Sequence, residues 1–183
     1  MTLPIVSERL RLRRFTEGDV HDLLECVSHP SVAGATPEIE ASETGVKEYI
    51  EAQSALAPFE ADKCFDLALE RREDGKVIGL VTLVRRKHRK GEMGWALGVN
   101  HRGKGYAMEA ASALMTYGFE VLDLHRIEAR TNSGNAASWR LMERLGMVQE
   151  AHLRDAVSRD GRWLDSLIYG TLARERKTKH ERE

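Results

Sequence analysis

The chain has 183 residues, of which 42% are hydrophobic and 31% are charged, and its formal net charge is −1. This length predicts one domain, and the hydrophobic content excludes a disordered chain. A charge so close to zero excludes a protein that is basic throughout and leaves room only for a local basic patch.

Cysteine usage and the lack of targeting segments predict a cytoplasmic protein. Cys26 and Cys64 form no C-x-x-C pair, and two thiols in a chain of this length make no disulfide framework. The N-terminal residues contain no apolar run typical of a signal peptide, and no stretch is long and apolar enough to span a membrane. We therefore expect no membrane partner.

The first half of the chain predicts helices followed by a group of antiparallel strands. Apolar residues alternate with arginines near the N-terminus, and they recur at helical spacing in the two segments that follow. The expected elements are a strand at residues 9–13, a helix after Thr16 that ends before Pro30, a helix from Ser42 to Pro58, and strands at 65–69, 76–84 and 92–99, with a hairpin turn at Asp74-Gly75.

The second half predicts alternating helices and strands. An alanine-rich helix follows the segment HRGKGYA, HRIEART is a strand, and Asn135 opens a further helix that Gly146 ends. A last hairpin turns at Asp160-Gly161, and residues 174–183 are expected to be a frayed, charged tail. The order of elements predicts a mixed α/β sheet flanked by helices, within a single domain at residues 7–173.

The segment between the last strand of the first group and the alanine-rich helix carries the most information. Gly103 and Gly105 alternate with Arg102 and Lys104 in it. Glycines let the backbone turn so that successive N–H groups point into one concavity, and a helix N-terminus adds unpaired donors and a partial positive charge. This arrangement predicts a binding site for a pyrophosphate, although glycine-rich surface turns without a ligand are also common.

Three phosphate-binding templates compete for this loop. A dinucleotide fingerprint requires glycine or alanine at position 108, where the chain has Met108. A P-loop requires a hydroxyl for magnesium at position 105, where the chain has Gly105. The third template, R-x-x-G-x-A, is matched by Arg102, Gly105 and Ala107, and it is the coenzyme A loop of the GCN5-related N-acetyltransferases.

The sequence resembles that family over residues 7–173, and specifically its ribosomal-protein N-terminal acetyltransferase (Rim-type) branch. The segments that carry the resemblance are SERLRLRRF, GEMGWALGVNHRGKGYAMEA, HRIEARTNSGNAASWRLMERLGM and the C-terminal hairpin. The resemblance implies a splayed, mostly antiparallel central sheet flanked by helices. It also implies that acetyl-CoA, wedged in the splay, donates its acetyl group to an amine, and no metal is expected.

The resemblance also implies roles for particular residues. Backbone groups of Leu97, Gly98 and Val99 would bind the pantetheine arm, and Arg102 would supply positive charge. Asn135 would contact the cofactor arm, and Ser138 would protonate the leaving thiolate. Amides of the loop and of the first helical turn would hold the pyrophosphate, namely those of Gly103, Lys104, Gly105, Tyr106, Ala107 and Met108.

The chemistry of acyl transfer leaves alternatives open for the catalytic groups. The amine must lose a proton, and Glu92 is the candidate base, although a charged strand end explains it equally well. Asn135 and Ser138 fit a helix cap as well as a catalytic pair. Met142 stands where many relatives have a tyrosine, which excludes a tyrosine acid there. An α-amine with a pKa near 7.7–8.0 needs a base far less than a lysine amine with a pKa near 10.4.

The acceptor is therefore predicted to be a protein N-terminal α-amine, attacking acetyl-CoA directly in a ternary complex. The alternative acceptor is a small amine, such as a polyamine, an amino acid or a drug. The non-enzyme alternative is an RNA- or ribosome-associated module that uses the basic run from Arg85 to Lys90, but we expect that run to be a solvated hairpin tip. A homodimer is left open.

Overall fold

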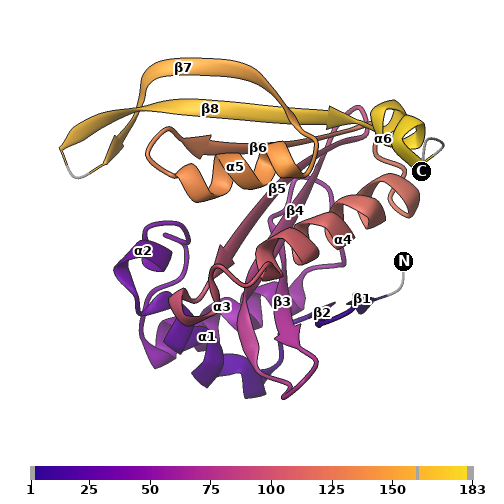
Figure 1. Cartoon of the computed structure of the whole chain (residues 1–183). Helices are drawn as coiled ribbons and strands as arrows, with labels where there is room; N and C mark the ends of the chain where they lie inside the picture. The colour runs from indigo at the N-terminus through magenta and orange to yellow at the C-terminus, as the bar shows by residue number, and fades with distance from the viewer. Residues whose placement is uncertain (1–2, 160, 181–183) are drawn as a thin grey trace.

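The computed structural model describes residues 3–159 and 161–180, and it contains an eight-stranded sheet with helices on both faces (Figure 1). All neighbouring strands are antiparallel except the pair in the middle, β5 and β6, which is parallel. In spatial order the strands are β1 (Ile5–Val6), β2 (Leu10–Arg13), β3 (Phe65–Arg71), β4 (Val77–Arg86), β5 (Lys90–Leu97), β6 (Arg126–Asn132), β8 (Arg162–Leu172) and β7 (Val148–Arg159).

The four helices that the sequence predicts are all present. Ser42 caps its helix through a hydrogen bond from the Gly45 N–H to the Ser42 Oγ, as the sequence predicts. The helical segments are η1 (Glu17–Asp19), α1 (Val20–Val27), α2 (Pro30–Ala33), α3 (Glu43–Ala55), η2 (Val99–His101), α4 (Tyr106–Glu120), α5 (Ala136–Arg144) and α6 (Ala173–His180).

The sheet is buried on both faces, which explains why β3 is more apolar than an exposed strand. Leu67 and Leu69 belong to the core beneath α4, whereas Ala68 between them belongs to the core beneath α1 and α3. Small residues in α4, including Ala110 and Ala111, are completely buried, so that this helix lies close against the sheet.

The parallel pair β5–β6 separates after a short contact. Residues 90–92 of β5 pair with residues 126–128 of β6, and beyond these three pairs both strands continue without pairing to each other. The sheet is therefore splayed at its centre, as the sequence resemblance implies, and a space opens between the ends of β5 and β6.

The C-terminal segment corrects one expectation. Residues 174–183 were expected to be a frayed tail, but α6 is helical as far as His180, and residues 181–183 lie outside the described part of the chain. The tail prediction is wrong for this helix because Arg176 lies against α4, with its Nη2 3.2 Å from the Thr116 Oγ1. The last hairpin is confirmed by the pairing of Arg159 with Arg162, although Asp160 itself is not described.

Within the described residues, no helix has the length and apolar character needed to cross a membrane.

Candidate active site

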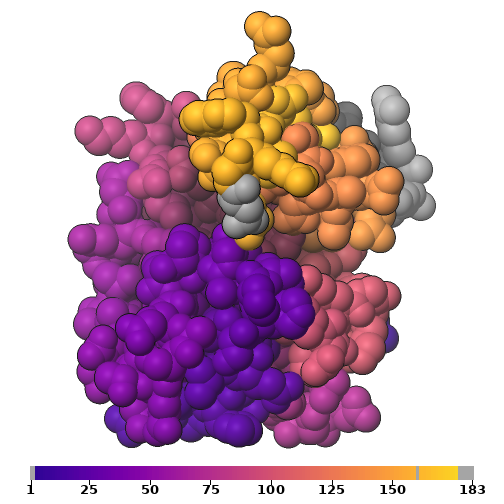
Figure 2. Space-filling model, turned by 90° about the vertical axis from the view of Figure 1, so that its left-hand side faces the viewer, coloured from indigo at the N-terminus to yellow at the C-terminus, as the bar shows by residue number. Residues whose placement is uncertain are grey.

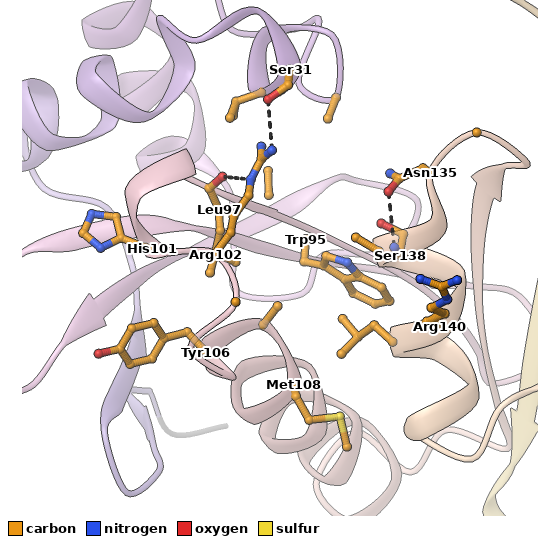
Figure 3. A pocket seen from close by; sticks show the side chains of 18 of the residues that line it. Ser31, Trp95, Leu97, His101, Arg102, Tyr106, Met108, Asn135, Ser138 and Arg140 are labelled. Carbon is orange, nitrogen blue, oxygen red and sulfur yellow. Dashed lines mark hydrogen bonds between the residues drawn. The ribbon is translucent and has the colours of Figure 1, made fainter.

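A cavity of about 1200 Å³ occupies the splay between β5 and β6. It extends from the end of β5, past the glycine loop and the first turn of α4, to the first turns of α5 (Figure 3). Nine of the predicted binding residues line it: Leu97, Arg102, Gly103, Gly105, Tyr106, Ala107, Met108, Asn135 and Ser138. The fold therefore brings together the glycine loop and the start of α5, where Gly105 and Asn135 are 30 positions apart in the chain.

The glycine loop has the conformation that its sequence predicts. Gly103 and Gly105 have φ angles of +75° and +83°, in the left-handed region that favours glycine, and Gly105 is the N-cap of α4. No hydrogen bond joins the main-chain N–H groups of residues 103–108 to any described acceptor. Six consecutive donors at a helix N-terminus are thus free to bind an anion.

The two cations of the loop hold its shape. The Arg102 Nε donates to the Leu97 carbonyl oxygen at 3.1 Å, and its Nη1 donates to the Ser31 Oγ of α2 at 3.0 Å (Figure 3). The Lys104 Nζ donates to the Asn100 carbonyl oxygen at 2.9 Å, and Lys104 does not line the cavity. Both side chains thus add positive charge near the loop while they anchor its backbone.

His101 is a buried neighbour of the loop whose Nδ1 has no hydrogen-bond partner among the described residues. It lines the cavity. Burial lowers the pKa of its imidazole, and the nearby cations Arg71, Lys76 and Lys104 lower it further. His101 is therefore neutral near pH 7 and can offer a hydrogen bond but no charge.

Gly98 and Val99 lie outside the lining of the cavity. The Gly98 N–H donates to the Ile78 carbonyl oxygen at 3.0 Å, and the Gly98 carbonyl oxygen accepts from the His101 N–H at 3.0 Å. A side chain at position 98 would meet the Cys26 Sγ at 2.8 Å, so close packing accounts for this glycine. The unpaired edge of β5 that faces the cavity lies at residues 95–97 instead.

The start of α5 places Asn135 and Ser138 on the opposite wall. The Asn135 Oδ1 accepts a hydrogen bond from the Ser138 N–H at 3.2 Å, so Asn135 is the N-cap of the helix (Figure 3). The Ser138 side chain is half-buried, and its hydroxyl makes no hydrogen bond to another described residue. Met142, one turn further on, is buried in the core.

Glu92 does not reach the cavity. It is the last residue of β5 that pairs with β6, so it lies at the closed end of the splay. Its Oε2 accepts a hydrogen bond from the Arg86 Nη2 at 2.8 Å. This carboxylate is therefore part of an ion pair, away from both cavities described here.

A second cavity of about 250 Å³ adjoins the first. Both cavities are lined by Trp95, Asn135 and Ser138, so these residues lie at their junction. The smaller cavity adds residues that the sequence did not single out, among them Glu38, Thr82 and Arg130, and Arg159 lines both cavities. They come from a loop and three separate strands, and no local pattern connects them.

Arg140 and Arg144 are further lining residues of the large cavity that the sequence analysis missed. Their spacing of four residues in a predicted helix could have placed them on one face. Among the described residues no group of three His, Cys, Asp or Glu side chains forms a metal site, and the expectation that no metal takes part stays a prediction.

The model of the acetyltransferase (GNAT) domain family matches residues 9–148. The uncharacterized N-acetyltransferase YnaD of Bacillus subtilis (strain 168) is 30% identical over 173 residues, which cover 93% of this chain and 98% of that protein. The crystal structure of a GNAT-family acetyltransferase from Bacillus anthracis superimposes with a TM-score of 0.81 at 26% identity, over 94% of this chain and 99% of that one.

Two relatives with named acceptors match about half of the chain. The [Ribosomal protein uS5]-alanine N-acetyltransferase of Escherichia coli (strain K12) is 29% identical over 99 residues, covering 52% of this chain and 51% of that protein. The spermidine N(1)-acetyltransferase of Vibrio cholerae (serotype O1, strain El Tor Inaba N16961) is 33% identical over 91 residues, covering 49% of this chain and 53% of that protein. The splayed sheet, the free amides of the loop and the extent of these matches lead to one conclusion: the chain belongs to the GNAT family of acetyltransferases.

Proposed function

We propose that this chain transfers the acetyl group of acetyl-CoA to a primary amine by direct attack within a ternary complex. The observation that carries the proposal is the run of six unpartnered N–H groups at residues 103–108, a segment in which every residue except Lys104 lines the cavity in the splay of the sheet. Hydrogen bonds to charged groups contribute about 1.5–3 kcal/mol each, so several of these donors suffice to hold a pyrophosphate without a metal.

Other residues that line the cavity suggest how acetyl-CoA lies in it. The free edge of β5 at residues 95–97 can hydrogen-bond the pantetheine arm like an added strand, which moves the predicted contact upstream from Gly98 and Val99. This path leads to Ser138 at the junction of the two cavities. The free Ser138 hydroxyl there can donate a proton to the leaving thiolate, whose thiol has an ordinary pKa near 8.5.

A protein N-terminal α-amine is our first choice of acceptor. Such an amine is partly neutral at working pH. The partial relatives support both a protein N-terminus and a polyamine as acceptor classes. A small amine is therefore the second choice.

The basic run is less suited to RNA than its composition suggests. Arg86 is paired with Asp62 and Glu92, and Arg89 with Asp123, so part of its charge is neutralised within the protein. This supports the transferase over an RNA-associated module.

Thermal unfolding with acetyl-CoA tests the donor site. A ligand at a hundredfold its Kd adds about 2.7 kcal/mol of stability. In a domain of this size that corresponds to a Tm rise of about 5–11 °C. An unchanged Tm at millimolar acetyl-CoA would refute the proposal.

A Ser138→Ala substitution tests the proton donor. We expect kcat to fall by about 10²–10⁴-fold while the Kd for acetyl-CoA is unchanged, because the hydroxyl is needed only as the C–S bond breaks. Ser133→Ala, in the turn before α5 and outside both cavities, is the matched control. Equal turnover in the two variants would remove Ser138 from the mechanism.

A further inference from the structure

The smaller cavity has Glu38 as the one carboxylate among its described lining residues. Glu38 belongs to the loop between α2 and α3. The cavity that it lines also contains Ser138 and Trp95, the residues at the junction with the donor cavity. No ion pair joins Glu38 to a described cation, although Arg130 and Arg159 line the same cavity.

A second carboxylate lies just behind the wall of this cavity. Asp66 of β3 is buried and accepts hydrogen bonds from the hydroxyls of Tyr49 and Thr82. Thr82 itself lines the cavity, so Asp66 is separated from it by a single side chain. On this side of the cavity the two carboxylates attract an ammonium, and that attraction strengthens where protein replaces water, whereas Arg130 and Arg159 line the same cavity and oppose it.

We propose that Glu38 binds the ammonium group of the acceptor and accepts the proton that the amine must lose before attack. This inference rests on the proposed acetyltransferase function. It assigns the base to the loop between α2 and α3, in place of Glu92, which is ion-paired with Arg86 at the closed end of the splay.

The surroundings of Glu38 suit a proton acceptor. Burial raises the pKa of the Glu38 carboxyl, its own backbone N–H opposes the rise, and the charge of Asp66 adds to it. The same residue is accessible to solvent, so that a captured proton can leave. A carboxylate with a raised pKa is a stronger base than an ordinary glutamate.

Two protons leave the amine nitrogen in the proposed transfer. Glu38 takes one proton from the ammonium, and the amine nitrogen then forms a bond to the acetyl carbonyl carbon. As the carbon–sulfur bond breaks, Ser138 gives its hydroxyl proton to the sulfur and receives the second proton that leaves the nitrogen. The products are the N-acetyl amide and the free thiol, and Glu38 releases the first proton to water.

One end of the C-terminal hairpin contacts the loop beside this cavity. A Cβ at Gly34, next to α2, would lie 2.0 Å from the Arg159 Nη2, so β7 touches the loop that leads to Glu38. Figure 2 shows the hairpin directly above the N-terminal helices. The charged or titratable groups around Glu38 are thus Tyr49 of α3, Asp66 of β3, Cys64 in the loop before β3, and Arg130 and Arg159 from β6 and β7.

The test is a Glu38→Gln variant, with Glu48→Gln on the exposed face of α3 as the matched control. The acceptors are a short peptide with a free N-terminal alanine and spermidine, each assayed with acetyl-CoA from pH 6 to 9.5. We expect kcat/KM of Glu38→Gln at pH 7 to be about a hundredfold or more below wild type, with the acetyl-CoA Kd within twofold. The deficit should shrink toward pH 9.5, because neutral amine then forms without a base.

The alternative outcomes separate this inference from the proposed function. The role of Glu38 alone is overturned if the wild type acetylates either amine and kcat/KM of Glu38→Gln lies within threefold of the wild-type value. It is also overturned if the deficit of the variant does not change with pH. A wild type that does not bind acetyl-CoA overturns the proposed function. If acetyl-CoA binds but neither amine reacts, the affinity of each amine for the CoA-loaded protein is measured instead. Binding to Glu38→Gln that is at least tenfold weaker than to the wild type supports the role of Glu38. Equal binding to both proteins, or no binding to either, overturns it.

Discussion

A Gly79→Ala substitution should damage both the stability of the protein and its donor site. Gly79 lies in β4 opposite Leu97 of β5, and its φ angle is +156°. An added Cβ would lie 2.2 Å from the Ala96 carbonyl oxygen and 2.9 Å from the Leu97 Cα, whereas ordinary contacts begin at 3.4 Å. Both contacts are backbone atoms of the strand that lines the cavity, so no side chain can rotate away to relieve them.

The expected loss follows from two contributions. Unfavourable backbone conformation in a non-glycine residue costs about 1–3 kcal/mol. Separating β4 from β5 by about 1 Å weakens one or two ladder hydrogen bonds, each worth about 0.5–1.5 kcal/mol. The sum is about 1.5–6 kcal/mol in the free energy of unfolding, or a Tm lower by roughly 3–24 °C for a domain of this size.

Urea unfolding measures this loss, and titration with acetyl-CoA measures its effect on the site. The control is Gly75→Ala in the β3–β4 turn, where φ is +73° and no atom lies within 4 Å of the added Cβ. It should cost only the left-handed strain of about 1–2 kcal/mol and leave the acetyl-CoA Kd unchanged. Equal stability of the two variants, with equal affinity for acetyl-CoA, would show that the close approach of the strands does not constrain the site.

Two further predictions concern titratable groups. Burial opposes ionisation of Asp19, but hydrogen bonds from Arg13 and from the Thr16 N–H outweigh it and lower the pKa of that carboxyl. The stabilisation by ionised Asp19 is therefore fully present above the unfolded pKa near 3.9 and is lost as the pH falls through the folded pKa. In urea unfolding, Asp19→Asn should lower the free energy of unfolding by about 1.5–3 kcal/mol at pH 7 and by progressively less below pH 4. A difference between variant and wild type that stays constant with pH would contradict this. Burial raises the pKa of the Cys26 thiol to about 11, so Cys26 should react with iodoacetamide at pH 8 at least roughly a hundredfold more slowly than free cysteine until urea unfolds the chain, whereas Cys64 is exposed and should react faster than Cys26. Labelling of native Cys26 at the rate of free cysteine would contradict the raised pKa.

Local features of the protein were predictable because short-range sterics and hydrogen bonding decide them. Gly103 and Gly105 adopt left-handed angles that other residues avoid, and Ser42 and Asn135 cap helices through bonds to amides three residues away. The conformation of the anion-binding loop follows from such contacts alone.

The candidate acceptor cavity depends on contacts between distant segments. Glu38, Thr82 and Arg130 become neighbours only when a loop, β4 and β6 are assembled, and nothing in the residues around each one indicates the others. Strand register likewise decides the position of Glu92. Pairing of β5 with β6 ends at Glu92 opposite Glu128, so its side chain lies at the closed end of the splay.

The amino-acid sequence by itself thus determined the order of the elements, the loop conformation and the family resemblance, since these depend on neighbouring residues and on motifs in chain order. Only the tertiary structure decided where β5 and β6 part, which carboxylate reaches the cavity, and that the last helix packs against Thr116. The physical reason is that packing and register join residues far apart in the chain, and the free energy of those contacts is not encoded in any one local pattern.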